Sequence, residues 1–329
     1  MIQSVNLPLS ETCAAPWGGW AGLERTLRVL GLDGVEGIWP GEEIPPDFPP
    51  ALLTGYHLTF FPDWLDFYRG DRDALRRKFR DEATVRALYG GTEPDCLLEA
   101  YRADLERAIR LSAAYVVFHV SDVSVEEGFT YRWLHADREV LDASLEIINA
   151  LLEGVEPAFE FLVENQWWPG FTFTDPAQTE YLLSRIRFPR TGIMLDTGHL
   201  MNTEPRIRNQ REGIDYIRRR LREHGELGAA VRGVHFHQSV SGAYVRRTAG
   251  RMPEGFPKDY FAGFGQSYDH IRQIDRHRPW TDPACADLLE ELGPAYLTHE
   301  LSAGPKRTQR AALKRQLSTL RRGGYMTRE

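Results

Sequence analysis

The segment TGIMLDTGHL, residues 191–200, joins an apolar run of strand length to a carboxylate, Asp196, and to an imidazole, His199, three residues later. A short apolar run bounded by turn signals is typical of a strand that is buried on both faces of a parallel sheet. Similar runs recur along the chain, separated by longer segments whose apolar residues are spaced three and four apart, as in amphipathic helices. This alternation predicts βα units around a parallel sheet.

Eight strand-length runs are present, and eight is the number of βα units that closes a (β/α)8 TIM barrel. The clearest intervening helices are expected at 96–112, 138–153 and 211–224. Because barrels of this type commonly reach the length of this 329-residue chain, we predict an α/β protein with a single domain over 1–329. The predicted strands are 2–6, 34–38, 54–60, 114–120, 158–164, 191–196, 231–237 and 295–300.

Two connections are too long to be plain loops: about 61–94, after the third strand, and about 238–283, after the seventh. Both insertions follow the C-terminal end of a strand, so we expect them to overhang the active face of the barrel. A basic helix is predicted at 306–322. Its cations are expected to form a solvated outer face, with phosphate binding as the alternative.

The composition is that of a globular protein, with 42% hydrophobic and 26% charged residues. The net charge of −7 provides no overall field for a polyanion, so nucleic acid is not expected as a partner. The three cysteines, Cys13, Cys96 and Cys285, are far apart and odd in number, which argues against a disulfide framework. With no signal-peptide pattern and no apolar run of the ~18 residues that a membrane span needs, we expect a cytoplasmic protein without membrane contact. The oligomeric state stays open.

Side chains that can bind metal stand at the ends of the predicted strands. Because the C-terminal ends of all barrel strands meet at one mouth, residues that are distant in sequence come close together there. Buried carboxylates and imidazoles without a cation are costly, and a bound metal removes that cost. Imidazole and carboxylate ligands without thiolate suit catalytic zinc, manganese or iron. The candidates are His57, His119, Glu164, Asp196, His199, His235 and Glu300.

The second insertion adds two candidates. Asp275 and His277 are expected at alternate positions of an extended segment, so their side chains point the same way. His237 is an alternative to His235. The simpler interpretation of each candidate is a hydrogen-bonded residue of the core or rim, or for Asp196 a helix N-cap. The remaining histidines are expected to be structural: His135, His224, His270 and His299.

Aromatic residues follow the carboxylate of the fifth strand. Trp167 and Trp168 come directly after Glu164, Asn165 and Gln166. Such rings either stack on a substrate ring or pack an insertion onto the barrel, and both interpretations stay open. The candidate substrate-binding residues are Trp167, Trp168, His237 and His277.

The order and surroundings of these residues resemble the xylose-isomerase-like barrel superfamily, which contains sugar isomerases and epimerases as well as apurinic endonucleases of the endonuclease IV type. In the endonuclease branch nine residues hold three zinc ions, and a residue of matching type stands in this chain at each step. The resemblance spans nearly the whole chain. Its motifs are YHLTF around His57, VFHVS around His119, VENQ at Glu164, LDTGHL, GVHFHQS at His235, DRHR at 275–278 and THELS at Glu300.

This chain departs from the endonuclease pattern in its loops. QWWPGF replaces the glycine-rich continuation after Glu164 and Asn165, RPWTD replaces the glycine-rich turn after His277, and Gln238 stands where that branch usually has Asp. Because these loops face the substrate, the resemblance implies a substrate other than duplex DNA.

The resemblance implies two alternative enzymatic functions, and a third, non-enzymatic hypothesis stays open beside them. The first is a hydrolase with two or three zinc ions that acts on a phosphoester of a small or medium-sized molecule, with Glu164 bridging two ions. The second is a sugar isomerase or epimerase with one Mn²⁺ or Mg²⁺, in which Glu164 and Glu300 exchange the proton next to the carbonyl. The third is a metal-containing binding protein without turnover. The candidate catalytic residues are Glu164, Glu300 and His199, and the partner is a small phosphorylated or sugar-containing molecule.

Overall fold

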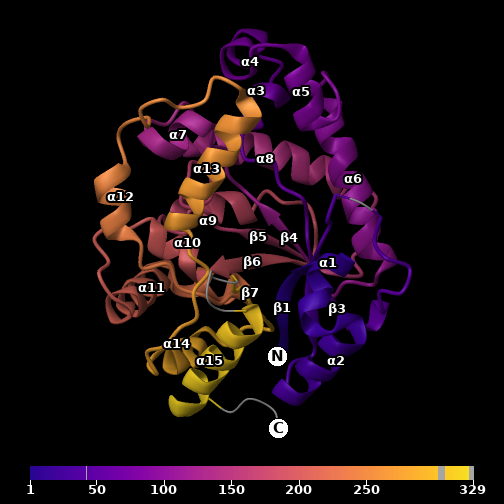
Figure 1. Ribbon diagram of the computed structural model, residues 1–329, viewed down its shortest axis with the longest axis vertical. Helices are drawn as coiled ribbons and strands as arrows, with labels where there is room; N and C mark the ends of the chain where they lie inside the picture. Colours follow the sequence, from indigo (N-terminus) through magenta and orange to yellow (C-terminus); the bar gives the residue numbers. More distant parts are fainter. Residues whose placement is uncertain (42, 303–307, 326–329) are drawn as a thin grey trace.

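Eight parallel strands form a closed barrel in the computed structural model, which describes residues 1–41, 43–302 and 308–325. Each strand pairs with its neighbours in sequence, and β8 pairs with β1. The prediction of a (β/α)8 barrel is therefore confirmed, and Figure 1 shows the strands at its centre. The strands are β1 (Ile2–Pro8), β2 (Gly34–Ile38), β3 (Leu53–His57), β4 (Tyr115–His119), β5 (Glu160–Glu164), β6 (Thr191–Asp196), β7 (Val231–His235) and β8 (Tyr296–His299).

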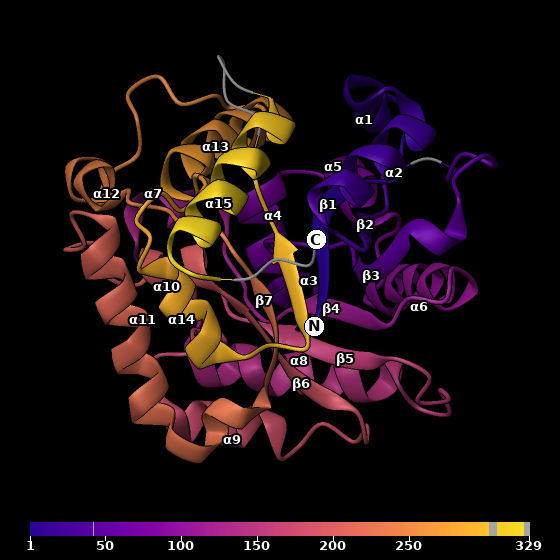
Figure 2. The same cartoon turned by 90° about the horizontal axis from the view of Figure 1, so that it is seen from below.

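Helices surround the barrel and bury their apolar faces against the strands (Figure 2). Within the described ranges no helix is both long and apolar enough to cross a lipid bilayer. The helices that follow the barrel strands are α1 (Glu11–Ala14), α2 (Gly19–Leu30), α6 (Asp95–Arg110), α7 (Val125–Thr130), α8 (Asp137–Leu151), α9 (Pro176–Leu183), α10 (Thr197–Asn202), α11 (Gln210–His224), α14 (Cys285–Leu292) and α15 (Gln309–Arg322), with 3₁₀ turns at Ala15–Trp17, Pro50–Leu52 and Gly225–Ala230.

The two long connections fold into helices of their own. The segment after β3 forms α3 (Leu65–Tyr68), α4 (Arg72–Phe79) and α5 (Glu82–Tyr89), and the segment after β7 forms α12 (Gly242–Thr248) and α13 (Tyr260–Ile274). Helix α13 packs against α7, and the two helices lie side by side in both Figure 1 and Figure 2. The ring of Phe79 lies 4.8 Å from the ring of Tyr260, so the two insertions contact each other.

The alternation of side chains along the strands determines what faces the barrel interior. In β5, Phe161 and Val163 pack toward the helices, whereas Leu162 joins an interior cluster with Val117 and Met194. Two residues further along the strand the same alternation turns Glu164 inward. The register pairs His119 with Glu164 and Asp196 with His235. The uppermost interior positions of six successive strands are therefore His57, His119, Glu164, Asp196, His235 and Glu300, the last directly after β8.

Two strands end two or three residues earlier than predicted. The third strand was predicted at 54–60 and ends at His57, and the seventh was predicted at 231–237 and ends at His235. In both cases a side-chain acceptor takes a backbone N–H group that would otherwise extend the ladder. The N–H of Thr59 donates to Asp104 at 2.6 Å, and the N–H of His237 donates to the Thr197 hydroxyl at 3.2 Å. Of the predicted helix 306–322, α15 is described, and Lys306 and Arg307 lie outside the described residues.

A tight contact inside the barrel provides a test of this packing. A Cβ atom on Gly55 would lie 2.1 Å from the Tyr115 ring, whose hydroxyl donates to Glu36 at 2.8 Å. We therefore expect Gly55→Ala to lower the free energy of unfolding by about 1–3 kcal/mol. Gly228→Ala, where the new atom meets nothing within 4 Å, is the control, with a change within about 0.5 kcal/mol. Urea denaturation followed by circular dichroism measures both, and equal stabilities would show that the interior has spare room beside Tyr115.

Candidate metal centre

The nine predicted ligands lie together at the mouth of the barrel, where they form three adjacent groups with His237 as a tenth member. Within each group the potential ligand atoms lie within 4.8 Å of one another. Glu164 belongs to two groups and so joins them. The first group is His57, His119 and Glu164; the second is Glu164, Asp196, His235 and Glu300; the third is His199, His237, Asp275 and His277.

In the first group three acceptor-capable atoms converge. The Nε2 atoms of His57 and His119 are 3.0 Å apart, and each lies 3.1 Å from Oε2 of Glu164. The Nδ1 atom of His57 is 2.8 Å from the carbonyl oxygen of Leu58, to which it can only donate. In a neutral ring Nε2 then carries the lone pair and is directed toward the other two residues. This is the arrangement in which an imidazole binds a metal.

In the second group His235 is oriented by Glu36, a residue that the sequence analysis did not identify. The Nε2 atom of His235 lies 3.0 Å from Glu36, which also accepts hydrogen bonds from Tyr115 at 2.8 Å and Thr298 at 3.0 Å. Because Nε2–H donates to Glu36, Nδ1 presents a lone pair, 3.1 Å from Glu300 Oε2. The available signal was a carboxylate in the middle of the otherwise apolar strand GVEGI.

In the third group the histidine of the LDTGHL motif faces the second insertion. The Nδ1 atom of His199 lies 3.0 Å from the carbonyl oxygen of Asn165, so Nε2 is directed toward Asp275 Oδ2, at 3.4 Å. His237 does not replace His235: its Nε2 contacts Asp196 Oδ2 at 2.8 Å, and both histidines reach the centre. The N-cap expected for Asp196 is also present, since Oδ1 accepts the His199 N–H at 2.6 Å.

The segment that carries Asp275 and His277 was predicted to be extended, but its backbone is irregular. His277 adopts a left-handed φ of 41°, and its side chain hydrogen-bonds that of Asp275. A two-way backbone bridge between Gln238 and Arg278 holds this segment against the end of β7. The Gln238 side chain accepts the N–H of Val240 at 3.1 Å, so it stabilises the loop and stands outside the three groups.

The donor atoms in these groups fit a divalent cation. Among the described residues, Glu164 Oε1, His235 Nδ1, His237 Nδ1 and Glu300 Oε2 are buried without a hydrogen-bond partner. Buried polar atoms nearly always have one, because an unsatisfied atom keeps its desolvation cost. A cation accepts several lone pairs at once, and a set of imidazoles and carboxylates without thiolate suits catalytic zinc, manganese or iron.

The comparison with known proteins agrees with this fold. The sequence matches the model of the family described as xylose isomerase-like TIM barrel over residues 25–322. The chain belongs to this family. A comparison with curated proteins finds no match.

Solved structures of similar fold include an endonuclease, a zinc-containing protein and a sugar epimerase. Endonuclease IV from Thermus thermophilus is 16% identical with a TM-score of 0.51, and the match covers 98% of this chain and 100% of that chain. The IolI protein with a bound zinc atom is 15% identical with a TM-score of 0.54, and the match covers 100% of both chains. D-allulose 3-epimerase from Methylomonas sp. in complex with D-allulose is 12% identical with a TM-score of 0.52, and the match covers 98% of this chain and 96% of that chain. At these identities the likeness shows the fold alone. It includes both a nuclease and an epimerase, so it does not choose between the two reaction classes.

In this xylose isomerase-like barrel the buried carboxylates favour the protonated form of His235. Burial alone would lower the pKa of His235, but Glu36, Glu164 and Glu300 raise it well above its usual value. Burial opposes ionisation of Glu164 as well, yet His119 and His235 bring its pKa well below its usual range. The carboxylates therefore attract protons to the same imidazole nitrogens that would bind a metal, and metal binding releases those protons.

The two predicted substrate-binding tryptophans are mostly buried. Trp167 and Trp168 are 6% and 8% exposed and pack in a cluster with Val123, from the connection after β4, and with Val245 and Ile274, from the connection after β7. The Trp167 ring lies 5.0 Å from the His199 ring, so it supports a candidate ligand from the side. Substrate contact by these residues stays a prediction.

Phe60 is the aromatic residue with the largest exposed fraction beside the three groups. It is 47% exposed, and its ring lies 4.5 Å from the ring of His119 at an angle of 31°. It lies within the predicted strand 54–60 but after the end of β3, and no role was predicted for it. The histidines expected to be structural stand outside the three groups and contact other partners: His135 with Asp66, His224 with Thr179, His270 with Tyr244, and His299 with Gln316.

The role of Glu36 in orienting His235 can be tested. We expect Glu36→Gln to weaken zinc binding about 10–100-fold, since an amide no longer fixes the tautomer and basicity of His235. Glu160→Gln is the control, because Glu160 lies at the opposite end of β5 and pairs with Arg232 at 2.8 Å. Competition with a chromogenic chelator measures both affinities. Unchanged zinc affinity in folded Glu36→Gln protein would refute the orienting role.

Proposed function

We propose that this protein is a multinuclear zinc hydrolase that cleaves a phosphoester bond of a small or medium-sized molecule other than DNA. The observation that carries the proposal is the position of Glu164. Its Oε2 atom lies 3.1 Å from Nε2 of both His57 and His119, and its Oε1 atom lies 3.3 Å from Nδ1 of His235. One carboxylate can thus serve two cations.

The first and third groups favour hydrolysis over isomerisation. A single-metal isomerase needs only the second group. His57, His119 and the whole third group, which are buried or half-buried, would then have no cation. Zinc ions bound in such a centre supply Lewis acidity and a water whose pKa is lowered toward neutrality, which is the chemistry that phosphoester hydrolysis requires.

Side chains around the ligands hold the centre in place. Asn165 accepts the backbone N–H of Asp196 at 2.8 Å and donates to its carbonyl oxygen at 3.1 Å, so the end of β6 is fixed to the end of β5. Glu300 connects the second and third groups: Oε2 is 3.1 Å from His235 Nδ1, and Oε1 is 3.6 Å from His277 Nδ1. This rigid set holds a reacting phosphoester in one orientation.

A small substrate is supported by charge and by the surface at the mouth. The net charge of −7 gives no general attraction for a polyanion such as duplex DNA. Phe60 offers an exposed aromatic face next to His119, on which a ring of the substrate can stack.

The alternative is a sugar isomerase or epimerase with one Mn²⁺ or Mg²⁺ in the second group. The observation in its favour is that Glu164 and Glu300 both flank Nδ1 of His235, at 3.3 and 3.1 Å, so two carboxylates stand beside one cation position. Such a pair suits proton exchange next to a carbonyl.

A substitution in the first group distinguishes the hydrolase from the isomerase. For a hydrolase we expect two or three zinc ions per chain, and we expect His119→Asn to lose about one ion and to lower hydrolysis of bis(p-nitrophenyl) phosphate roughly 100-fold or more. His135→Asn, which changes a histidine outside the three groups, is the control. Metal analysis and steady-state kinetics are the measurements.

The opposite pattern would support the alternative. One exchangeable manganese ion, with ketose epimerisation that persists in His119→Asn, would overturn the hydrolase. A zinc-loaded protein that turns over neither phosphoesters nor sugars would support a binding protein without catalysis.

The stacking role of Phe60 gives a separate prediction. We expect Phe60→Ala to raise KM for an aromatic phosphoester about 3- to 10-fold, with kcat and zinc content unchanged. Phe261→Ala is the matched control, because Phe261 is also 47% exposed but lies on α13. If both variants keep the wild-type KM, the substrate does not stack on Phe60.

A further inference from the structure

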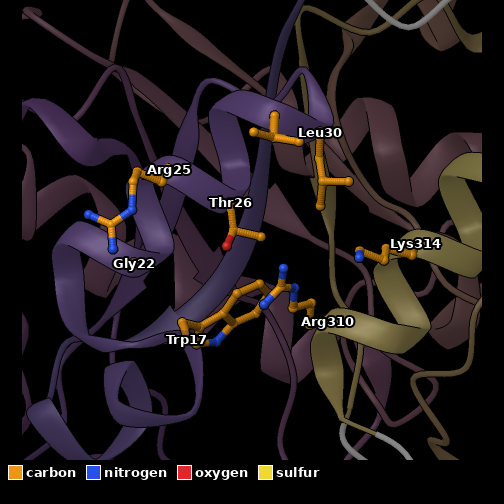
Figure 3. Close-up of a pocket in the computed structure, with 8 residues that line it drawn as sticks. Trp17, Gly22, Arg25, Thr26, Leu30, Arg310 and Lys314 are labelled. Atoms are coloured by element: carbon orange, nitrogen blue, oxygen red, sulfur yellow. The ribbon is translucent and has the colours of Figure 1, made fainter.

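A cavity separate from the metal centre lies between α2 and α15 (Figure 3). Its volume is about 340 Å³, which is within the range of small-molecule sites. None of its lining residues belongs to the three metal groups. Its walls include Trp17, Arg25, Thr26, Leu30, Arg310 and Lys314.

The cations of this cavity have no anionic partner in the described part of the chain. Arg25, Arg310 and Lys314 line the cavity, no carboxylate does, and none of the three makes an ion pair or side-chain hydrogen bond with a described residue. Several surface arginines elsewhere are paired, as Arg28 is with Glu24 at 2.6 Å and Arg218 with Glu291 at 2.6 Å. Unpaired cations around one cavity create a local positive potential.

The surrounding charge strengthens this potential. Helix α15 contains five lysine and arginine residues and no acidic residue, although the whole chain has a net charge of −7. The basic helix that the sequence predicted is thus more than a uniformly solvated surface, because two of its cations face a cavity shared with α2.

The remaining walls combine a hydroxyl with apolar groups. Trp17 and Thr26 are buried, at 6% and 9% exposure, so their positions are fixed by packing. Val29 is 84% exposed at the edge of the cavity, where it offers an apolar contact surface to a ligand. Figure 3 shows Arg25 on one side of Thr26 and Lys314 on the other, with Trp17 between them.

We propose that this cavity binds a small phosphate monoester, with Arg25, Arg310 and Lys314 around the phosphate and the organic part against Trp17 and Val29. Guanidinium and ammonium groups are the usual phosphate donors, and the Thr26 hydroxyl adds another. The ligand's organic part contributes by covering the exposed apolar edge. This proposal does not depend on the hydrolase function, because it uses no residue of the metal centre.

Calorimetric titration of the zinc-loaded 329-residue chain with adenosine 5′-monophosphate tests the proposal. We expect the wild type to bind this probe more tightly than inorganic phosphate, and adenosine without phosphate to bind far more weakly. Arg310→Gln and Lys314→Gln should each weaken binding about tenfold, which corresponds to the loss of one charge-assisted hydrogen bond. Arg315→Gln, on the same helix but outside the cavity, should bind as the wild type does.

A second variant excludes binding at the metal centre. His119→Asn, which alters the first metal group, should keep the calorimetric binding event unchanged. The proposal is overturned if no binding is detected at millimolar probe, if adenosine binds as tightly as its monophosphate, or if phosphate alone binds as tightly as the nucleotide. It is also overturned if Arg310→Gln and Lys314→Gln bind like Arg315→Gln.

Discussion

Carboxylates and imidazoles that share a buried space must either find a cation or remain unsatisfied, and the mouth of this barrel is arranged around that constraint. Glu164 is its centre, with imidazole nitrogens of four histidines within 3.3 Å of its two oxygens. These contacts bring together residues of β3, β4, β5 and β7 and the start of α10. The hydrogen-bonded ladders of the closed barrel hold these side chains at one mouth, so they cannot move apart to relieve the cost.

The interior of the barrel below the centre takes part in the same arrangement. Ser4, Tyr115, Thr298 and Glu36 form a connected polar layer, with hydrogen bonds of 2.8–3.0 Å, among residues that are nearly or fully buried. Its carboxylate is directed upward to His235. A buried Glu in an apolar barrel is costly by itself. The position of Glu36 is explained by its contact with His235. Glu36 fixes the orientation of the His235 ring, and this orientation decides which ring nitrogen faces the other residues of the second group.

The barrel and the candidate ligands could be predicted from the sequence because both depend on local patterns. Successive side chains of a strand point to opposite faces of the sheet. A strand that ends in His119, Glu164 or Asp196 therefore places that residue at the mouth once the sheet closes. Glu36 could not be recognised in this way, because its partner His235 lies on β7, a strand that is not adjacent to β2 in the sheet, and the contact crosses the interior. Phe60 was misplaced because Asp104, from a helix, ends the β3 ladder early. The left-handed His277 follows from a bridge between Gln238 and Arg278 that no local pattern indicates.

The departures from the endonuclease pattern form one connected structure. Trp167 and Trp168, in the QWWPGF segment, pack against Ile274, the residue before Asp275, and Trp167 also contacts the ring of His199. The tryptophans therefore link the loop after β5 to the end of α13, which carries half of the third group. The two insertions contact each other through Phe79 and Tyr260, so the position of α13 also depends on the insertion after β3. In this protein the third group is assembled from strand ends and an insertion together. The geometry of the third group can therefore vary with the insertions, whereas the barrel strands fix the first and second groups. Such a division lets a metal centre keep its chemistry while its substrate changes.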